Sequence, residues 1–170
     1  MSPPKLTRPI LARHLAMCGH VVFGERYVVL ENLKTPGGVG VDLAVVSTLP
    51  EPSVHAVIAA AAFSEARQGI DALVRVRGER VANTHWLAAT LDAYVALGRP
   101  RELEKNGIGL VVVRVESTFG LGSAETIVEL PAKPEARRAW WVQLEEALRA
   151  RGRQDLVEAL RGTLGKKPRV

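Results

Sequence analysis

Hydrophobic residues in this sequence gather in short runs that are separated by turn residues. Two of these runs, residues 41–47 and 54–61, flank the segment STLPEPS, in which Pro50 and Pro52 can continue neither a ladder nor a helix. Both runs are rich in Val and Ala and nearly free of polar residues, as expected for adjacent strands buried on both faces. They predict the middle of the sheet of an α/β protein.

Five further segments predict strands around this centre. Residues 21–23, 27–29 and 93–97 have high strand propensity. Residues 108–115 form the clearest strand of the chain because they are almost wholly apolar and rich in β-branched side chains. Residues 125–130 alternate between polar and apolar side chains, which is typical of a strand at the edge of a sheet.

Helical spacing predicts the elements that cover this sheet. Thr7 is expected to cap a first helix that ends at Gly19, and Ser64 to cap a second one. Residues 83–92 predict a short helix or an irregular lead-in, and Pro100 opens another brief helix.

The pattern becomes helical again beyond Pro131 and Pro134. Residues 135–150 predict an amphipathic helix, and a shorter helix follows Gly152. One face of the longer helix carries three large apolar side chains, those of Trp141, Leu144 and Leu148. Because a helix outside the sheet offers a self-complementary surface, this face predicts a homodimer.

Together these elements predict an α/β fold with a mixed central β-sheet of about five or six strands flanked by helices. Residues 1–134 form the predicted α/β domain, and residues 135–170 a basic C-terminal helical hairpin.

Composition narrows the class of protein. Hydrophobic residues make up 47% of the sequence and charged residues 24%, so the chain can bury a substantial core. Cys18 is the single cysteine, which excludes an intramolecular disulfide and predicts a cytoplasmic protein. Without an apolar run of about 20 residues, no membrane association is expected. The preference for Arg over Lys fits a thermophile or a GC-rich genome.

The positive charge is concentrated near the C-terminus. Residues 135–170 hold nine Lys and Arg against five Asp and Glu, whereas the net charge of the whole chain is +5. Such a tail suits a polyanionic partner, so it predicts contacts with nucleic-acid phosphates, with DNA favoured over RNA. The residues expected to make these contacts are Arg137, Arg138, Arg149, Arg151, Arg153, Lys166, Lys167 and Arg169.

Asp42 is the one polar side chain that interrupts the first central strand. A carboxylate in a buried strand is costly to desolvate unless it meets a cation, a metal or several donors. Asp42 either caps the preceding GGVG turn or faces a metal ion or a phosphate. A zinc site is not expected, because the chain has one cysteine and its four histidines, at 14, 20, 55 and 85, are far apart in sequence.

The order of the elements resembles that of the restriction-endonuclease-like fold of the PD-(D/E)xK nuclease superfamily. In GVDLAVV, Asp42 stands where that family places its first metal-binding aspartate, and VHAVIAAAA stands where it has its E-x-K strand. The segment DAYVALGRPRELEKNGIGLVVV resembles the strand, helix and strand that close the family's sheet. The resemblance covers residues 7–130 and implies a nuclease-like fold.

The sequence departs from the family at the second half of its motif. The family uses Asp and Glu to hold Mg²⁺ and Lys to stabilise developing charge. Where Glu-x-Lys is expected, this chain has Ile58, Ala59, Ala60 and Ala61. The resemblance therefore implies a nuclease-like protein that binds nucleic acid without cleaving it and needs no cofactor.

Two alternatives remain open at this point. One is a Mg²⁺-dependent nuclease with a rearranged site, in which Asp42 binds the metal together with Glu31 or Glu65. The other is an oligomeric scaffold protein that assembles through the tryptophan-bearing helix.

Overall fold

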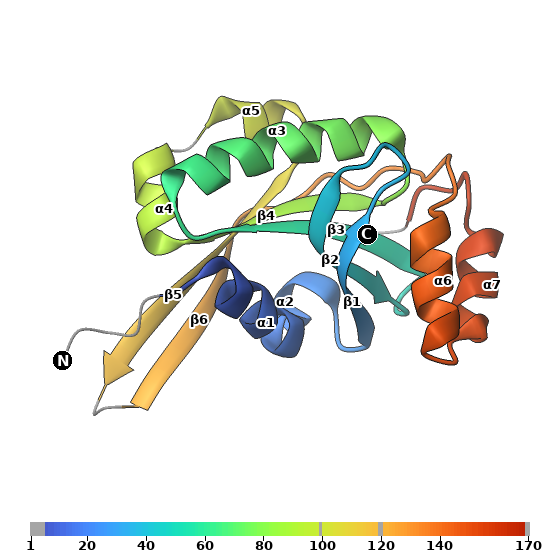
Figure 1. Ribbon diagram of the computed structural model, residues 1–170, viewed down its shortest axis with the longest axis horizontal. Coiled ribbons are helices and arrows are strands. Elements are labelled where there is room, and N and C mark those ends of the chain that lie inside the picture. Colours follow the sequence, from blue (N-terminus) through green and yellow to red (C-terminus); the bar gives the residue numbers. More distant parts are fainter. Residues whose placement is uncertain (1–5, 99, 119–120, 169–170) are drawn as a thin grey trace.

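The computed structural model describes residues 6–98, 100–118 and 121–168. Six strands form one sheet in the order β1-β2-β3-β4-β5-β6. Their bounds are Tyr27–Lys34, Gly40–Ser47, Ser53–Ala60, Thr84–Thr90, Gly109–Thr118 and Leu121–Leu130. The pairs β1–β2, β2–β3 and β5–β6 are antiparallel, whereas β3–β4 and β4–β5 are parallel. The predicted α/β fold with a mixed central sheet is confirmed, and Figure 1 shows its layers.

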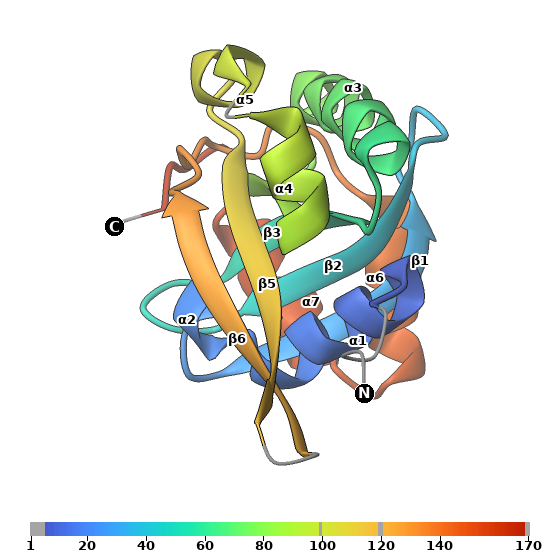
Figure 2. The ribbon, with the colours of Figure 1, turned by 90° about the vertical axis from the view of Figure 1, so that its left-hand side faces the viewer.

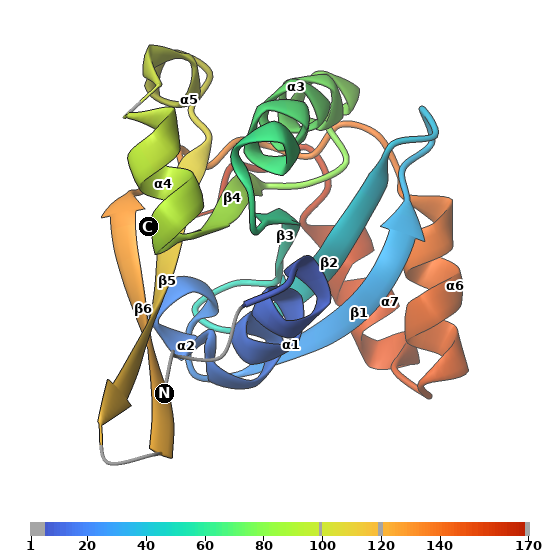
Figure 3. The ribbon, with the colours of Figure 1, turned by 60° about the vertical axis from the view of Figure 1, so that its left-hand side comes forward.

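Helices cover both faces of this sheet. The long helix α3 (Phe63–Glu79) lies on one face, and α1 (Arg8–Cys18) and α2 (His20–Phe23) lie on the other, as Figure 3 shows. Side chains of β3 alternate between the two layers: Ile58 packs in the core that contains α3, and Val57 in the core that contains Phe23 of α2. Both faces are buried, which explains why this strand has no polar face in the sequence.

Between α3 and β5, a strand precedes a helix, which is the opposite of the predicted order. Residues 84–90 form the parallel strand β4, and the predicted strand over 93–97 is instead part of the helix α4 (Leu91–Leu97). Because β4 is buried on both faces, its sequence lacks the alternation that identifies most strands. Thr90 then starts α4, since its Oγ1 accepts a hydrogen bond from Ala93 N at 3.2 Å.

Smaller differences concern helix boundaries. Residues 21–23 belong to α2 and form no strand. The cap of α3 is Ala62, and Ser64 lies inside the helix. The short helix α5 (Arg101–Lys105) follows Pro100 as predicted. No helix among the described residues is both long enough and apolar enough to traverse a bilayer.

The C-terminal helices are α6 (Val142–Ala150) and α7 (Gln154–Gly162). The helix predicted over 135–150 therefore begins only at Val142. Residues 131–141, called the crossing segment below, run without regular secondary structure from the end of β6 to α6, as Figure 1 shows. Its backbone bonds to other parts of the chain: Glu135 N donates to Asn83 O at 2.8 Å, and Arg138 N donates to Arg80 O at 2.9 Å.

The tryptophan-bearing face turns inward. Trp141, Leu144 and Leu148 belong to the same core as α3, and Trp141 Nε1 donates to Lys34 O at 2.9 Å. The face on which the homodimer prediction was based is thus buried within the chain. The C-terminal hairpin shares its hydrophobic core with the sheet.

Arg137 is the anchor of the crossing segment. Its side chain is only 2% exposed, and its Nε donates to Asn83 Oδ1 at 3.0 Å. Its Nη2 donates to Leu160 O at 2.8 Å and to Thr163 Oγ1 at 2.6 Å. Burial lowers the pKa of Arg137 to about 10, so the guanidinium remains charged at neutral pH. These bonds join the α3–β4 loop, the crossing segment and α7.

We expect Arg137→Met to lower the free energy of unfolding by roughly 2–3 kcal/mol, because it removes three buried hydrogen bonds from a charged group. Urea unfolding followed by circular dichroism measures this change. The neighbouring variant Arg138→Met is the control, since Arg138 is exposed, and should change stability by less than about 0.5 kcal/mol. Equal effects of the two substitutions would contradict the anchoring role.

Candidate functional site

The carboxylate of Asp42 is bound within the protein. Its Oδ2 accepts a hydrogen bond from Ala59 N of β3 at 2.7 Å and forms an ion pair with Arg8 Nη2 of α1 at 3.0 Å. Asp42 therefore ties β2 to β3 and to α1, and does not cap the GGVG turn. The cation that a buried carboxylate requires is Arg8.

The other two predicted acids, Glu31 and Glu65, lie in different parts of the structure. Glu31 lies on β1 and lines the same cavity of about 200 Å³ as Asp42, Arg8 and Arg13. Glu65 lies in the first turn of α3, where its Oε1 accepts from Ala61 N at 2.9 Å. In residues 6–98, 100–118 and 121–168, no three His, Cys, Asp or Glu side chains are placed to share a metal ion.

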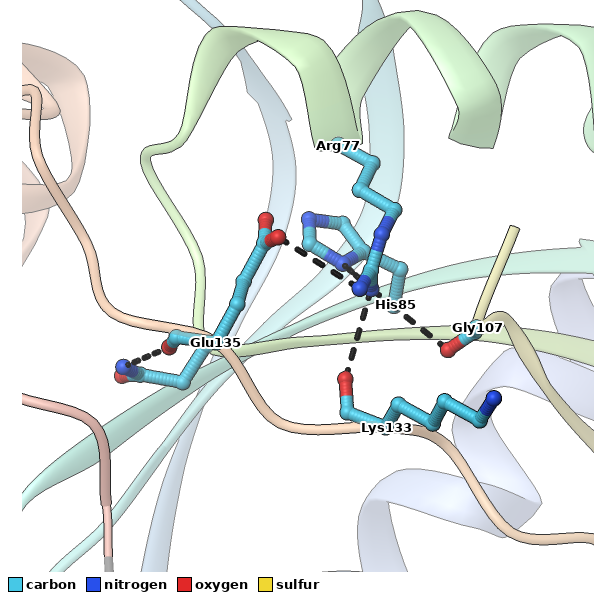
Figure 4. Close-up of polar contacts among 6 residues, drawn as sticks. Arg77, His85, Gly107, Lys133 and Glu135 are labelled. Atoms are coloured by element: carbon cyan, nitrogen blue, oxygen red, sulfur yellow. Dashed lines mark hydrogen bonds and ion pairs between the residues drawn. The ribbon is translucent and has the colours of Figure 1, made fainter.

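A second polar cluster surrounds Arg77 of α3. Figure 4 shows its guanidinium between the ring of His85, the carboxylate of Glu135 and two backbone carbonyl groups. Arg77 Nη2 forms an ion pair with Glu135 Oε2 at 3.4 Å, and Nη1 donates to Lys133 O at 3.3 Å. Nη1 also lies 3.5 Å from His85 Nδ1 and from Gly107 O. Arg77 thereby fixes the crossing segment against β4.

The electrostatics of this cluster follow from burial. Burial, and then the charge of Arg77, lowers the pKa of His85 to about 3, with a smaller effect of His55. Burial also raises the pKa of Glu135 against the opposing effect of Arg77 and Arg80. A neutral His85 can accept a hydrogen bond from Arg77 at Nδ1, which a protonated ring could not do.

Three of the eight predicted phosphate-binding residues are unsuited to that role. Arg137 is buried. Arg149 forms an ion pair with Glu145, and Arg153 forms one with Asp155. Arg169 lies outside the described residues. Four predicted cations remain exposed, with no ion pair to a described acid: Arg138, Arg151, Lys166 and Lys167.

Three of these four cations, Arg138, Lys166 and Lys167, lie on two backbone segments that run side by side. Gly165 N donates to Arg137 O at 2.7 Å, so the C-terminal segment begins beside the crossing segment. Pro168 lines a cavity together with Ala132 and Pro134, so the two segments run past each other in opposite directions (Figure 2). Lys133, Arg138, Lys166 and Lys167 lie on these two segments, and are called the cationic strip below. Lys133, which the sequence prediction omitted, is exposed and has no acidic partner in the described part of the chain.

Two features of the site could not be found by scanning for charge. Asn83 bonds both to Val54 of β3 and to the crossing segment, since its Oδ1 accepts from Val54 N at 2.9 Å and its Nδ2 donates to Glu135 O at 2.9 Å. His85 is isolated in the sequence but buried beside Arg77. The one signal in the sequence that could have identified them is that a polar residue, Asn83 or His85, stands next to an apolar run.

The comparisons with known proteins concern the fold alone. No family model matches the chain, and no curated protein matches it. Among solved structures, a protein of unknown function from Silicibacter pomeroyi has a similar fold, with a TM-score of 0.52. The match covers 95% of this chain and 92% of that chain at 15% sequence identity. The likeness extends across both the sheet and the C-terminal helices.

His85 and His55 should make stability depend on pH. Their folded-state pKa values, about 3 and about 4, lie below the ordinary value of 6.5. Between pH 6.5 and 4 the unfolded chain therefore binds protons that the folded chain does not, and stability falls as the pH falls. Each residue contributes up to about 1.4 kcal/mol per pH unit.

We expect His85→Gln to reduce the slope of unfolding free energy against pH by about 1.4 kcal/mol per unit over this window. Urea unfolding at several pH values between 6.5 and 4.5 measures the slope. His20→Gln replaces an exposed histidine and should leave the slope as in the wild type. An unchanged slope in His85→Gln would show that His85 is protonated in the folded protein.

Proposed function

We propose that this protein binds nucleic acid through backbone phosphates and does not cleave it. The observation that carries the proposal is the cationic strip, in which four exposed cations without acidic partners in the described chain lie on two adjacent segments. Lys and Arg side chains on such a surface neutralise phosphates and release the counterions that surround nucleic acid. Contacts of this kind do not depend on base sequence.

The attachment of the crossing segment to the rest of the chain supports the same function. The crossing segment is held by Asn83, Arg77 and the buried Arg137, so its exposed cations project from a fixed backbone. Fixed cations lose less conformational entropy on binding than cations on a free tail. We favour DNA as the partner, with RNA as the second probe.

The surroundings of Asp42 support a protein without nuclease activity. Arg8 already neutralises Asp42, and the neighbouring β3 position is Ala59, which has no metal ligand. Glu31 shares the cavity with Asp42, but two arginines line it as well. This donor set does not fit Mg²⁺, which prefers oxygen ligands in octahedral geometry. The proposal thus includes a relation to the PD-(D/E)xK nucleases with loss of their chemistry.

We expect the triple variant Arg138→Ala/Lys166→Ala/Lys167→Ala to bind duplex or single-stranded DNA at least tenfold more weakly than the wild type at low salt. The slope of log K against log salt should fall by about 2–3 because three phosphate contacts are lost. Fluorescence anisotropy at several salt concentrations measures both quantities.

The control removes three other cations from the same part of the chain. Arg149→Ala/Arg153→Ala/Arg161→Ala lowers the net charge equally, but these arginines are paired with Glu145 or Asp155. Its affinity should fall much less. Equal losses in the two variants would indicate a general charge effect, and no binding by the wild type would contradict the proposed function.

A plasmid-nicking assay tests the absence of cleavage. With Mg²⁺ or Mn²⁺ present, we expect neither the wild type nor Asp42→Asn to nick supercoiled DNA. The asparagine keeps an oxygen that can accept from Ala59 N, so the variant should remain folded. Nicking by the wild type that disappears in Asp42→Asn would show that Asp42 binds a catalytic metal.

A further inference from the structure

A cavity of about 290 Å³ opens between the β2–β3 hairpin, α2, the crossing segment and Pro168. Its walls are mostly apolar and include Phe23, Leu49 and Pro50. The polar groups that line it are Ser47, Ser53, His55 and Thr84, which lie at the end of β2 and the beginnings of β3 and β4. Ligand sites commonly combine an apolar wall with a few convergent polar groups in this way.

The polar groups form one hydrogen-bond chain. Trp86 Nε1 donates to Thr84 Oγ1 at 2.9 Å, because an indole nitrogen can only donate. The other partner of Thr84 Oγ1 is His55 Nδ1 at 2.5 Å, and the hydroxyl can donate to that nitrogen or accept from it. His55 is buried, and burial lowers its pKa to about 4. The neutral ring therefore donates at one nitrogen and accepts at the other.

The chain ends at two serines that line the cavity. His55 Nε2 lies 2.8 Å from Ser47 Oγ and 3.2 Å from Ser53 Oγ. The two hydroxyl oxygens are 2.6 Å apart, so one serine donates to the other. With the His55 proton on Nε2, that nitrogen donates to the serines, and the second serine hydrogen is left for a group in the cavity. With the proton on Nδ1, Nε2 accepts that hydrogen instead.

One residue of the cationic strip lies next to the rim of the cavity. Ala132, Pro134 and Pro168 line the cavity. Lys167 immediately precedes Pro168 in sequence, whereas Lys133 lies against Gly107 and its carbonyl oxygen accepts from Arg77. With the His55 proton on Nε2, a matching ligand combines a neutral ring that accepts a hydrogen bond with an anionic group near Lys167. The volume lies slightly below the usual ligand range of about 300–1,000 Å³, which suits one ring system.

We propose that His55 carries its proton on Nε2, and that this cavity takes an unstacked, carbonyl-bearing nucleobase from a single-stranded segment whose phosphates contact the cationic strip. The inference rests on the proposed function and adds a base contact to it. The aromatic ring of Phe23 and the imidazole of His55, with centroids 5.4 Å apart, line the cavity that receives the base. Proteins that bind single strands generally combine a basic groove with aromatic side chains that contact the bases.

The test compares two single strands that carry the same number of phosphates. One is a thymidine oligomer of about eight nucleotides, within the usual site size for single-strand binding. The other is the same oligomer with abasic tetrahydrofuran sites. We expect the wild type to bind the thymidine oligomer at least about tenfold more tightly. Equal binding of the two would overturn the base pocket while leaving phosphate binding intact, and no binding of either would overturn both proposals.

Two variants locate the effect. Ser53→Ala removes a hydroxyl from the end of the chain, and Ala132→Leu narrows the cavity without touching the hydrogen bonds. Each should reduce the preference for thymidine to about threefold or less, with little change in affinity for the abasic strand. Lys166→Ala/Lys167→Ala should instead weaken both strands equally. A preference that survives in both cavity variants would show that the base binds elsewhere.

The tautomer of His55 provides a measurement that needs no variant. We expect nitrogen-15 spectra at neutral pH to show the proton on Nε2. A proton on Nδ1 would reverse the chain, remove the O–H donor from the cavity and overturn the assignment of a carbonyl-bearing base.

Discussion

The backbone of the crossing segment has to find its hydrogen bonds outside any helix or sheet, and much of the structure depends on how it does so. Buried amide and carbonyl groups without partners cost about as much as a lost hydrogen bond. Asn83 resolves this locally, since its backbone and side chain both bond to Glu135. The same residue bonds to Val54 of β3, so the crossing segment is joined to the centre of the sheet.

Two arginines extend this attachment in different ways. Arg77 holds the segment from α3 and has Glu135 as its counter-ion. Arg137 holds it from within, and its described partners are neutral oxygens. A buried guanidinium is tolerated there because several hydrogen bonds replace its hydration. With both anchors in place, Trp141 enters the core and the C-terminal segment is positioned beside Lys133.

The sequence predicted the parts of the fold that depend on local pattern. β2 and β3 were recognisable because short runs of Val and Ala are bounded by prolines. β4 was misassigned because burial on both faces removed its periodicity, and THWLAAT contains good helix formers. The helix over 135–150 was predicted too long for a different reason: partners distant in sequence, chiefly Asn83 and Arg80, capture the backbone of its first part.

Local sequence pattern was also unable to predict the partners of the candidate residues. Asp42 was identifiable as a lone carboxylate in an apolar run, but its partner Arg8 is 34 residues away in sequence. His55 and Thr84 are 29 residues apart and meet only because β3 and β4 pair in parallel register. Register of this kind depends on the whole sheet, which no local pattern specifies.

The two ends of the β2–β3 hairpin differ in charge, and this difference bears on where a polyanion can bind. At the end near Asp42, two carboxylates and two arginines line one cavity, so their charges largely cancel. At the end near Ser47, the cavity lining carries no acidic or basic side chain other than that of His55, and the adjacent Lys167 has no acidic partner in the described chain. The binding free energy of a phosphate is therefore more favourable at the Ser47 end, where a cation can neutralise the phosphate and release its counterions. Under the proposed function, the surroundings of Asp42 are thus the less favourable place for nucleic acid.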